Sequence, residues 1–125
     1  NSTIMRHNEV YRRQLIKEWS PMNNITPSEL KVKLTANSDI KLIDCRELEE
    51  WEAVRIKHAN LIPLSQFEEQ SNQIELTDDE IVVHCHSGVR SLRACAYLKS
   101  LGHKNVTNLV GGIKLWEEEG LEVLK

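Results

Sequence analysis

The chain has 125 residues, a formal net charge of −3 and a hydrophobic fraction of 40%, which are typical of one globular domain. An acidic balance without a basic stripe argues against a nucleic-acid partner, and no apolar stretch is long enough to cross a bilayer. The three cysteines match neither a disulfide framework nor a paired metal-ligand pattern; they are Cys45, Cys85 and Cys95. We therefore expect a cytoplasmic protein without a signal peptide or membrane contact.

Residues 1–23 are predicted to form a helical extension or a linker. Apolar side chains recur at helical spacing over residues 8–19, which is typical of an amphipathic helix, and Ser20 and Pro21 then end it. The compact domain is expected to occupy residues 24–125.

The rest of the chain alternates between short apolar runs and helical stretches. Thr26 is a predicted N-cap, with Pro27 at the first helical position and Glu29 at the capping-box spacing. A second helix is predicted over residues 89–101, ended by Gly102. The strand candidates are residues 40–44, 59–63, 81–84 and 106–110. This order predicts an α/β domain with a mainly parallel central sheet and helices on both faces.

The most informative stretch is a buried strand that runs directly into Cys85, a short turn and a helix. In an open α/β sheet, ligands sit outside the carboxyl ends of the strands. Backbone amides of residues 86–90 would converge there, at a helix start whose dipole favours an anion. Such a site lowers the pKa of a thiol, and Arg90 would add a positive charge. We expect Cys85 to be a nucleophilic thiolate that solvent can reach.

The turn residues suit this role. Gly88 tolerates a positive φ and a close backbone approach, and Ser87 and Ser91 offer hydroxyl donors. His86 either tunes the potential of the loop, meets a substrate or is an exposed filler. The alternative for Cys85 itself is a small buried apolar side chain, as most free cysteines are. The strand, the glycine turn, the cation and the helix together favour the nucleophile.

Residues 85–91, Cys-His-Ser-Gly-Val-Arg-Ser, resemble the active-site loop of rhodanese-family sulfurtransferases. The resemblance spans residues 24–120, and its other elements are residues 42–47, 58–64 and 109–116. It implies a single rhodanese-like domain in which Cys85 and Arg90 are catalytic. The loop residues that it implies in substrate binding are His86, Ser87, Gly88, Val89 and Ser91.

The resemblance implies a double displacement. The Cys85 thiolate attacks a sulfane donor such as thiosulfate, which leaves a persulfide and sulfite, and a thiol, cyanide or carrier-protein acceptor then takes the outer sulfur. Neither a metal nor another cofactor is implied. Two rival functions are a catalytically silent binding or regulatory module and a phosphatase or arsenate reductase. Related phosphatases place five residues between cysteine and arginine, whereas four lie between Cys85 and Arg90, so sulfur chemistry is favoured over phosphorus chemistry.

Two residues after the strand at 40–44 have two interpretations each. Arg46 either helps an anionic donor approach or, as we favour, belongs with Asp44 to a buried ion pair or hydrogen-bond bracket that ties this strand end to the following helix, with Glu47 or Glu50 as a further candidate partner. Cys45 stands where the resembling motif usually has valine. It either resolves a persulfide into a disulfide or fills a valine-sized space, and the alternation of side chains along a strand argues for the filler. Cys95 is expected in the core.

Several conspicuous residues are predicted to have no chemical role. His84, Cys85 and His86 form a run that suggests a metal site, but adjacent strand positions face opposite sides of a sheet and no second ligand cluster exists in the sequence. Gly111–Gly112 is expected to allow a close turn before the last helix, and Trp116 is expected to pack inside.

The family's usual glycine is missing from residues 54–59. Some rhodanese-like domains fused behind adenylyltransferases share this departure, and those enzymes activate ubiquitin-like sulfur carriers in molybdopterin and thiamine biosynthesis. The resemblance thus suggests a ubiquitin-like sulfur-carrier protein or a cysteine desulfurase as a partner, with residues 1–23 as the end of a linker. A stand-alone sulfurtransferase is the favoured alternative.

Overall fold

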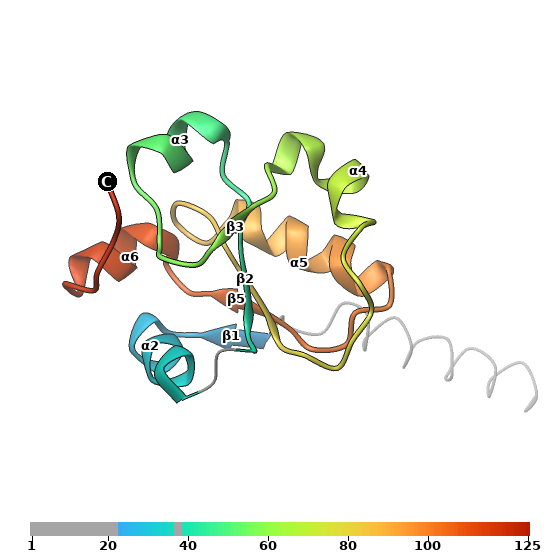
Figure 1. Ribbon diagram of the computed structural model, residues 1–125, viewed down its shortest axis with the longest axis horizontal. Helices are drawn as coiled ribbons and strands as arrows, with labels where there is room; N and C mark the ends of the chain where they lie inside the picture. The colour runs from blue at the N-terminus through green and yellow to red at the C-terminus, as the bar shows by residue number, and fades with distance from the viewer. Residues whose placement is uncertain (1–22, 37–38) are drawn as a thin grey trace, which may run out of the picture.

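The computed structural model describes residues 23–36 and 39–125, so the predicted helix over residues 8–19 lies outside the described part. The elements in chain order are β1 (Asn23–Ile25), α2 (Pro27–Ala36), β2 (Lys41–Asp44), α3 (Leu48–Ala53), β3 (Asn60–Leu61), the 3-10 turn η1 (Leu64–Gln66), α4 (Phe67–Ser71), β4 (Ile81–His84), α5 (Arg90–Ser100), β5 (Val106–Leu109) and α6 (Gly112–Glu118) (Figure 1). Within the described ranges, no helix has both the length and the apolar character that a membrane crossing requires.

The five strands form one parallel sheet in the order β1-β5-β4-β2-β3, which confirms the predicted sheet. The strand predicted over residues 59–63 is shorter in the structure, because Pro63 has no N–H to donate and η1 begins at Leu64. The prediction missed β1, whose three residues include Asn23 and Asn24 and are too short and polar to give a strand signal.

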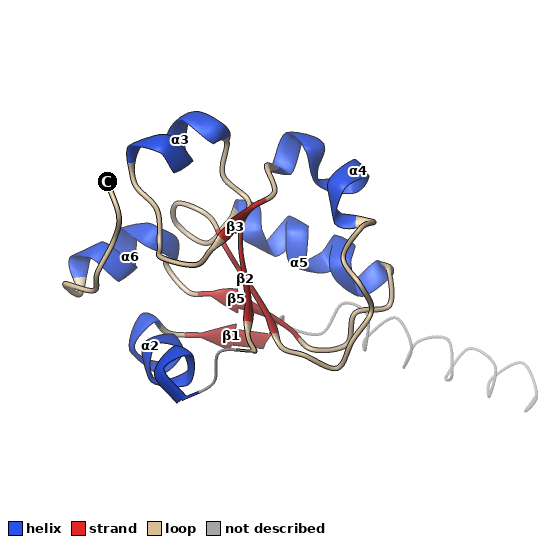
Figure 2. Ribbon diagram, in the orientation of Figure 1, coloured by secondary structure: helices blue, strands red, loops and turns tan. Residues whose placement is uncertain are grey.

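Helices cover both faces of the sheet (Figure 2), as predicted. Alternation along the strands divides the buried side chains into two groups. The α5-side core consists of Ile43, Cys45, Phe67, Ile81, Val83, Cys85, Ala94, Cys95, Leu98 and Val106. The α6-side core consists of Ile25, Leu30, Leu42, Ile56, Ala59, Val82, Leu109, Ile113 and Trp116. The predictions that Cys95 and Trp116 pack inside are confirmed.

Hydrogen bonds at two helix starts fix the loops that leave the sheet. The Thr26 hydroxyl accepts from the Glu29 amide at 3.2 Å, and the Glu29 carboxylate accepts from the Thr26 amide at 3.2 Å, which confirms the predicted capping box. A second capping box, between Glu47 and Glu50, starts α3. It sets α3 directly after β2, beside the carboxyl edge of the sheet.

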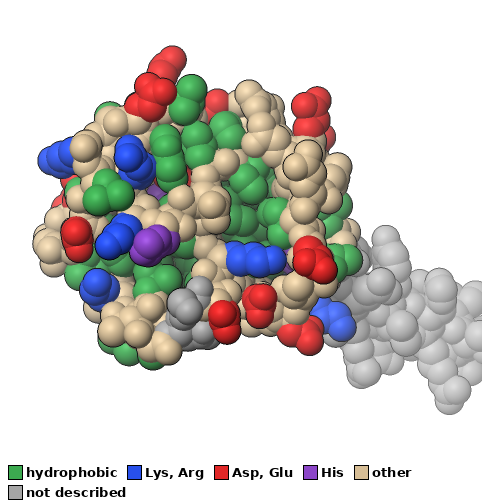
Figure 3. All heavy atoms as spheres, viewed as in Figure 1, with side chains coloured by type: hydrophobic (Ala, Val, Ile, Leu, Met, Phe, Trp, Pro, Cys, Tyr) green, Lys and Arg blue, Asp and Glu red, His purple; other side chains and the backbone are tan. Residues whose placement is uncertain are grey.

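Surface charges of both signs are interspersed. On the face in Figure 3, acidic and basic side chains surround apolar ones, which agrees with the small net charge of −3.

Candidate active site

Cys85 follows the last residue of β4 and lies under the turn formed by residues 86–89. The Gly88 amide donates to the Cys85 Sγ atom at 3.1 Å. Gly88 has a φ of +99°, and a Cβ atom there would lie 3.2 Å from the Gly111 amide nitrogen. Both properties expected of this glycine, a positive φ and a close backbone approach, are therefore present.

The turn closes over the sulfur. Only 1% of Cys85 is exposed, because its side chain points into the α5-side core; the expectation that solvent reaches it is not met in this arrangement. Three of the predicted loop residues, His86, Ser87 and Val89, are exposed and form the outer rim of the turn. A donor must therefore approach Cys85 through this rim.

Ser91, in the first turn of α5, links the sulfur to a buried polar chain. Its Oγ atom lies 3.4 Å from the Cys85 Sγ atom and donates to the Asn108 side-chain oxygen. The Asn108 amide group in turn donates to the Asn24 side-chain oxygen at 3.2 Å. Sequence reasoning missed Asn108, although an asparagine within a buried strand is a signal, because a buried polar side chain needs a partner.

Cys45 occupies the equivalent position after the neighbouring strand. Asp44 of β2 pairs with His84 of β4, and the Cys45 amide donates to the His84 carbonyl at 2.9 Å. The next residues, Cys45 and Cys85, therefore share a register position, and both belong to the α5-side core. The alternation argument against such a pair was wrong, because alternation acts within each strand while register brings equivalent positions of two strands to the same face.

These neighbours determine the charge state of Cys85. A hydrogen bond from the Cys45 thiol has the largest effect, burial opposes it, and hydrogen bonds from Ser91 and Gly88 add to it; together they lower the pKa of Cys85 to about 4. The same hydrogen bond, with burial, raises the pKa of Cys45. Burial raises the pKa of Cys95 to about 12. Cys85 is therefore the thiolate of the three cysteines at neutral pH.

Arg90, the first residue of α5, forms a bidentate ion pair with Glu50 of α3. The two N···O distances are 2.7 and 2.8 Å, across 40 residues of sequence. The pair lowers the pKa of Glu50 to about 2, and the hydrogen bonds to Glu50 are the main reason that the pKa of Arg90 is raised, with a smaller contribution from the Cys85 charge. The Arg90 guanidinium therefore donates to Glu50 in this structure. Sequence reasoning did not find this pair, since nothing in the sequence marks so distant a partner.

Of the two roles considered for Arg46, donor approach and a buried ion pair, the structure shows the buried ion pair. It is 2% exposed, its Nε and Nη2 atoms donate to the Asp44 carboxylate at 3.1 and 2.8 Å, and Nη2 also donates to the Val54 carbonyl at 2.6 Å. Arg46 therefore ties the end of β2 to the end of α3, with almost no surface left to meet a donor. His84 lies on this side, with its Nε2 atom 3.6 Å from the Asp44 carboxylate, and burial lowers its pKa.

The start of α6 supports the backbone of the Cys85 turn through two hydrogen bonds. The Cys85 and His86 carbonyls accept from the Ile113 and Lys114 amides, both at 3.0 Å. Gly112 has a φ of +59°, and a Cβ atom there would lie 2.5 Å from both carbonyl oxygens. The glycine pair was predicted only to form a turn, and the structure shows that it also supports the backbone of the Cys85 turn.

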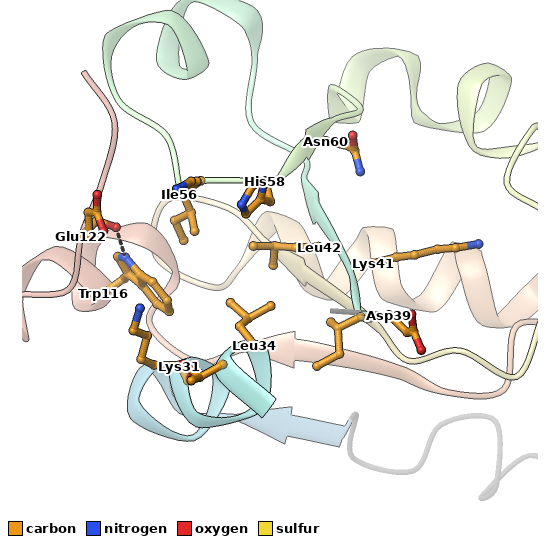
Figure 4. Close-up of a pocket in the computed structure, with 13 residues that line it drawn as sticks. Lys31, Leu34, Asp39, Lys41, Leu42, Ile56, His58, Asn60, Trp116 and Glu122 are labelled. Carbon is orange, nitrogen blue, oxygen red and sulfur yellow. Dashed lines mark hydrogen bonds between the residues drawn. The ribbon is translucent and has the colours of Figure 1, made fainter. Parts of the chain in front are cut away.

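A hollow of about 640 Å³ lies on the other face of the sheet. Figure 4 shows Leu42 from β2 and Trp116 from α6 around it. Its lining contains no residue of the Cys85 turn, so the hollow is separate from the candidate active site. Among residues 23–36 and 39–125, no three histidine, cysteine or acidic side chains gather where they could hold a metal ion.

Known proteins resemble this chain over most of its length. The family profile of the rhodanese-like domain matches residues 26–119. A sulfurtransferase of Allochromatium vinosum is 34% identical over 82% of this chain and 95% of its own length. YrkF of Bacillus subtilis, a candidate sulfur carrier protein, and MoeZ of Mycobacterium tuberculosis, a candidate adenylyltransferase/sulfurtransferase, are 35% and 37% identical over 78% of this chain. The matched regions cover only 52% and 25% of those two proteins.

A solved structure shows the same fold. The crystal structure of a rhodanese-like domain protein from Staphylococcus aureus superposes with a TM-score of 0.73 at 33% identity, covering 83% of this chain and all of that one. With its parallel sheet, its cysteine turn and a family match over residues 26–119, the chain belongs to the rhodanese-like domain family.

Proposed function

We propose that this chain carries a sulfane sulfur as a persulfide on Cys85, taken from a donor such as thiosulfate. Its family and its sulfurtransferase relatives support sulfur transfer in general. The observation that carries the finer proposal is the set of donors around one sulfur: the Gly88 amide at 3.1 Å and the thiol of Cys45 favour the thiolate of Cys85.

The reaction proceeds in two displacements at sulfur. The Cys85 thiolate attacks the outer sulfur of thiosulfate, a sulfur–sulfur bond forms, and the bond within thiosulfate breaks as sulfite leaves with its electron pair. The Cys85 persulfide anion then stays beside the donors of the turn. A thiol or cyanide nucleophile attacks the outer sulfur and restores the thiolate, so no external oxidant or reductant is needed with these two acceptors.

The residues of the turn have different roles in this proposal. The amide of Gly88 and the hydroxyl of Ser91 stabilise negative charge on the sulfur. The exposed rim, which consists of His86, Ser87 and Val89, meets the incoming donor. Arg90 favours an anionic donor through its charge while Glu50 holds its side chain in place.

Two observations disfavour the rival functions. Four residues separate Cys85 from Arg90, one fewer than the ring of the related phosphatases. A silent binding module has no need of a thiol whose pKa is lowered to about 4.

The test is incubation of the purified chain with thiosulfate, followed by intact mass measurement. We expect the wild type and Cys95→Ser to gain one sulfur atom and Cys85→Ser to gain none. Cys95 is a matched control, since it is buried in the same α5-side core but has a raised pKa. A wild type that gains no sulfur would contradict the proposal and favour the silent module.

We further propose a ubiquitin-like sulfur-carrier protein as the acceptor, with a cysteine desulfurase as an alternative donor. The support is the similarity to parts of MoeZ and YrkF. An adenylyltransferase coded upstream in the same reading frame would agree with this acceptor. Transfer of labelled sulfur from Cys85 to thiols, without transfer to the carboxyl terminus of any ubiquitin-like carrier, would instead indicate a stand-alone enzyme.

A cytoplasmic location is also proposed. Cys45, Cys85 and Cys95 are all free thiols, and reducing compartments keep thiols in this state. Fractionation of cells that produce the native protein tests the location, and recovery from an oxidising compartment would contradict it.

A further inference from the structure

We propose that Cys45 is a positioning residue for sulfur transfer, whose thiol donates a hydrogen bond to the Cys85 sulfur and holds that sulfur as the attacking thiolate. This inference rests on the proposed function, because it assigns a role to a residue beside the proposed nucleophile. It replaces both roles considered for Cys45 from the sequence, a resolving thiol and a valine-sized filler.

Strand pairing places the two sulfurs together. Neighbouring strands lie about 4.8 Å apart, and β2 and β4 are paired in register up to Asp44 and His84. The backbone of Cys45 is held on both sides: its amide donates to the His84 carbonyl at 2.9 Å, and its carbonyl accepts from the Leu64 amide at 3.0 Å. The side chain of Cys45 is therefore held against Cys85 by backbone pairing.

The hydrogen bond between Cys45 and Cys85 is important because both side chains are buried. Cys45 is 0% exposed and Cys85 is 1% exposed, and both lie in the α5-side core. A buried charge without hydrogen-bond donors is costly, and an interior of low dielectric strengthens those donors that are present. The thiolate of Cys85 therefore depends strongly on each neighbouring N–H, O–H and S–H group.

The Ser91 hydroxyl cannot fully replace the Cys45 thiol. A hydroxyl has one proton to donate, and the Asn108 side-chain oxygen competes with the Cys85 sulfur for the proton of Ser91. The Cys45 thiol and the backbone amides of Gly88 and Ser91 donate to the Cys85 sulfur without this competition. In the rhodanese-like motif this position usually carries valine, which fills the same space but has no proton to donate.

Other ionisable groups around Cys85 are common to the wild type and the variants at position 45. The groups on the packed elements are Arg90 and Cys95 of α5, Glu50 of α3, and Asp44, His84 and Arg46 at the ends of β2 and β4. The pKa of Glu50 is about 2 and that of Cys95 is about 12, so neither group titrates between pH 4 and 9. The other groups stay in place in every variant, so a shift between the profiles comes from position 45.

The experiment measures the rate of Cys85 alkylation by iodoacetamide against pH, with the modified peptide identified by mass. We expect the wild-type profile to titrate near pH 4. The Cys45→Val profile should titrate about one to two units higher, since a hydrogen bond to a charged group is lost. At about pH 5 the variant should react several-fold more slowly than the wild type. At about pH 8 Cys85 is ionised in both proteins, so the two rates should be similar.

Three further variants make the result specific. Cys45→Ser keeps a donor and should recover part of the shift, which a merely structural role of Cys45 would not predict. Cys45→Ala removes the donor without the added bulk of valine and should repeat the shift. Cys95→Val removes a thiol from the same α5-side core and should titrate with the wild type.

The proposal is overturned if Cys45→Val and Cys45→Ala both titrate with the wild type. This outcome is distinct from failure of the proposed function. A wild type that takes no sulfur from thiosulfate would contradict the sulfurtransferase, while the alkylation profiles would still report whether Cys45 stabilises the Cys85 thiolate.

Discussion

Replacing Gly112 with alanine should displace the turn that carries Cys85. A Cβ atom at this position would lie 2.5 Å from the Cys85 and His86 carbonyl oxygens, a distance that requires the backbone to move. The same residue has a φ of +59°, which an alanine adopts at a cost of about 1–2 kcal/mol. The substitution therefore combines a conformational cost with a clash against the active-site backbone.

The magnitude follows from the bonds that the clash would break. The Ile113 and Lys114 amides donate to those two carbonyls at 3.0 Å, and each such bond contributes about 0.5–1.5 kcal/mol. With the conformational cost, the expected loss in the free energy of unfolding for Gly112→Ala is about 2–5 kcal/mol. Sulfur uptake from thiosulfate should fall as well, because the Gly88 amide moves with the turn.

Gly120 supplies a matched control. Its φ is +76°, but a Cβ atom there would meet nothing within 4 Å, so Gly120→Ala should cost only about 1–2 kcal/mol and leave sulfur uptake unchanged. The assay is urea denaturation of both variants together with their rates of sulfur uptake. Equal losses of stability, with normal uptake by Gly112→Ala, would refute the claim that α6 supports the turn.

Three other substitutions have defined outcomes. Arg90→Ala should keep the fold and slow sulfur uptake about thirtyfold, or ~2 kcal/mol, through loss of anion stabilisation; an unchanged single-turnover rate would contradict the role of its charge. Arg46→Ala should lose about 3–5 kcal/mol of stability in urea denaturation, since Asp44 would be left as a buried unpaired carboxylate, and a loss below about 1 kcal/mol would show that the pair is dispensable. Ser91→Ala should raise the pKa of Cys85, measured by the alkylation profile of Cys85. An unshifted profile would show that the Ser91 hydroxyl does not stabilise the thiolate.

The sequence was sufficient for the local features of the site. A strand, Cys85, a glycine turn and a helix follow one another along the chain, so their order alone predicted where the sulfur lies and why Gly88 is needed. The capping box of Thr26 and Glu29 is local in the same sense, because both partners lie within one helical turn.

The contacts between distant segments could not be predicted in this way. Cys45 meets Cys85 because β2 and β4 pair in a particular register, and register depends on the packing of the whole sheet. Glu50 meets Arg90 across 40 residues because α3 and α5 start at the same edge of the sheet. The pattern of residue types within each segment carries no information about either of these two contacts.

Solvent access to the sulfur was also misjudged. The expected open thiolate is in fact covered by its own turn, with 1% of Cys85 exposed. A helix start predicts converging amides, but the direction of the side chain depends on the α5-side core beneath it.

The ultraviolet absorbance of the Cys85 thiolate, followed against pH and corrected with Cys85→Ser, tests the central claim most directly. A sulfur stabilised by Cys45, Ser91 and Gly88 should keep its thiolate absorbance as the pH falls to about 5 and lose it around pH 4, where the group takes up its proton. Loss of the absorbance already near pH 8.5, the ordinary range of a free thiol, would show that these donors do not hold the charge.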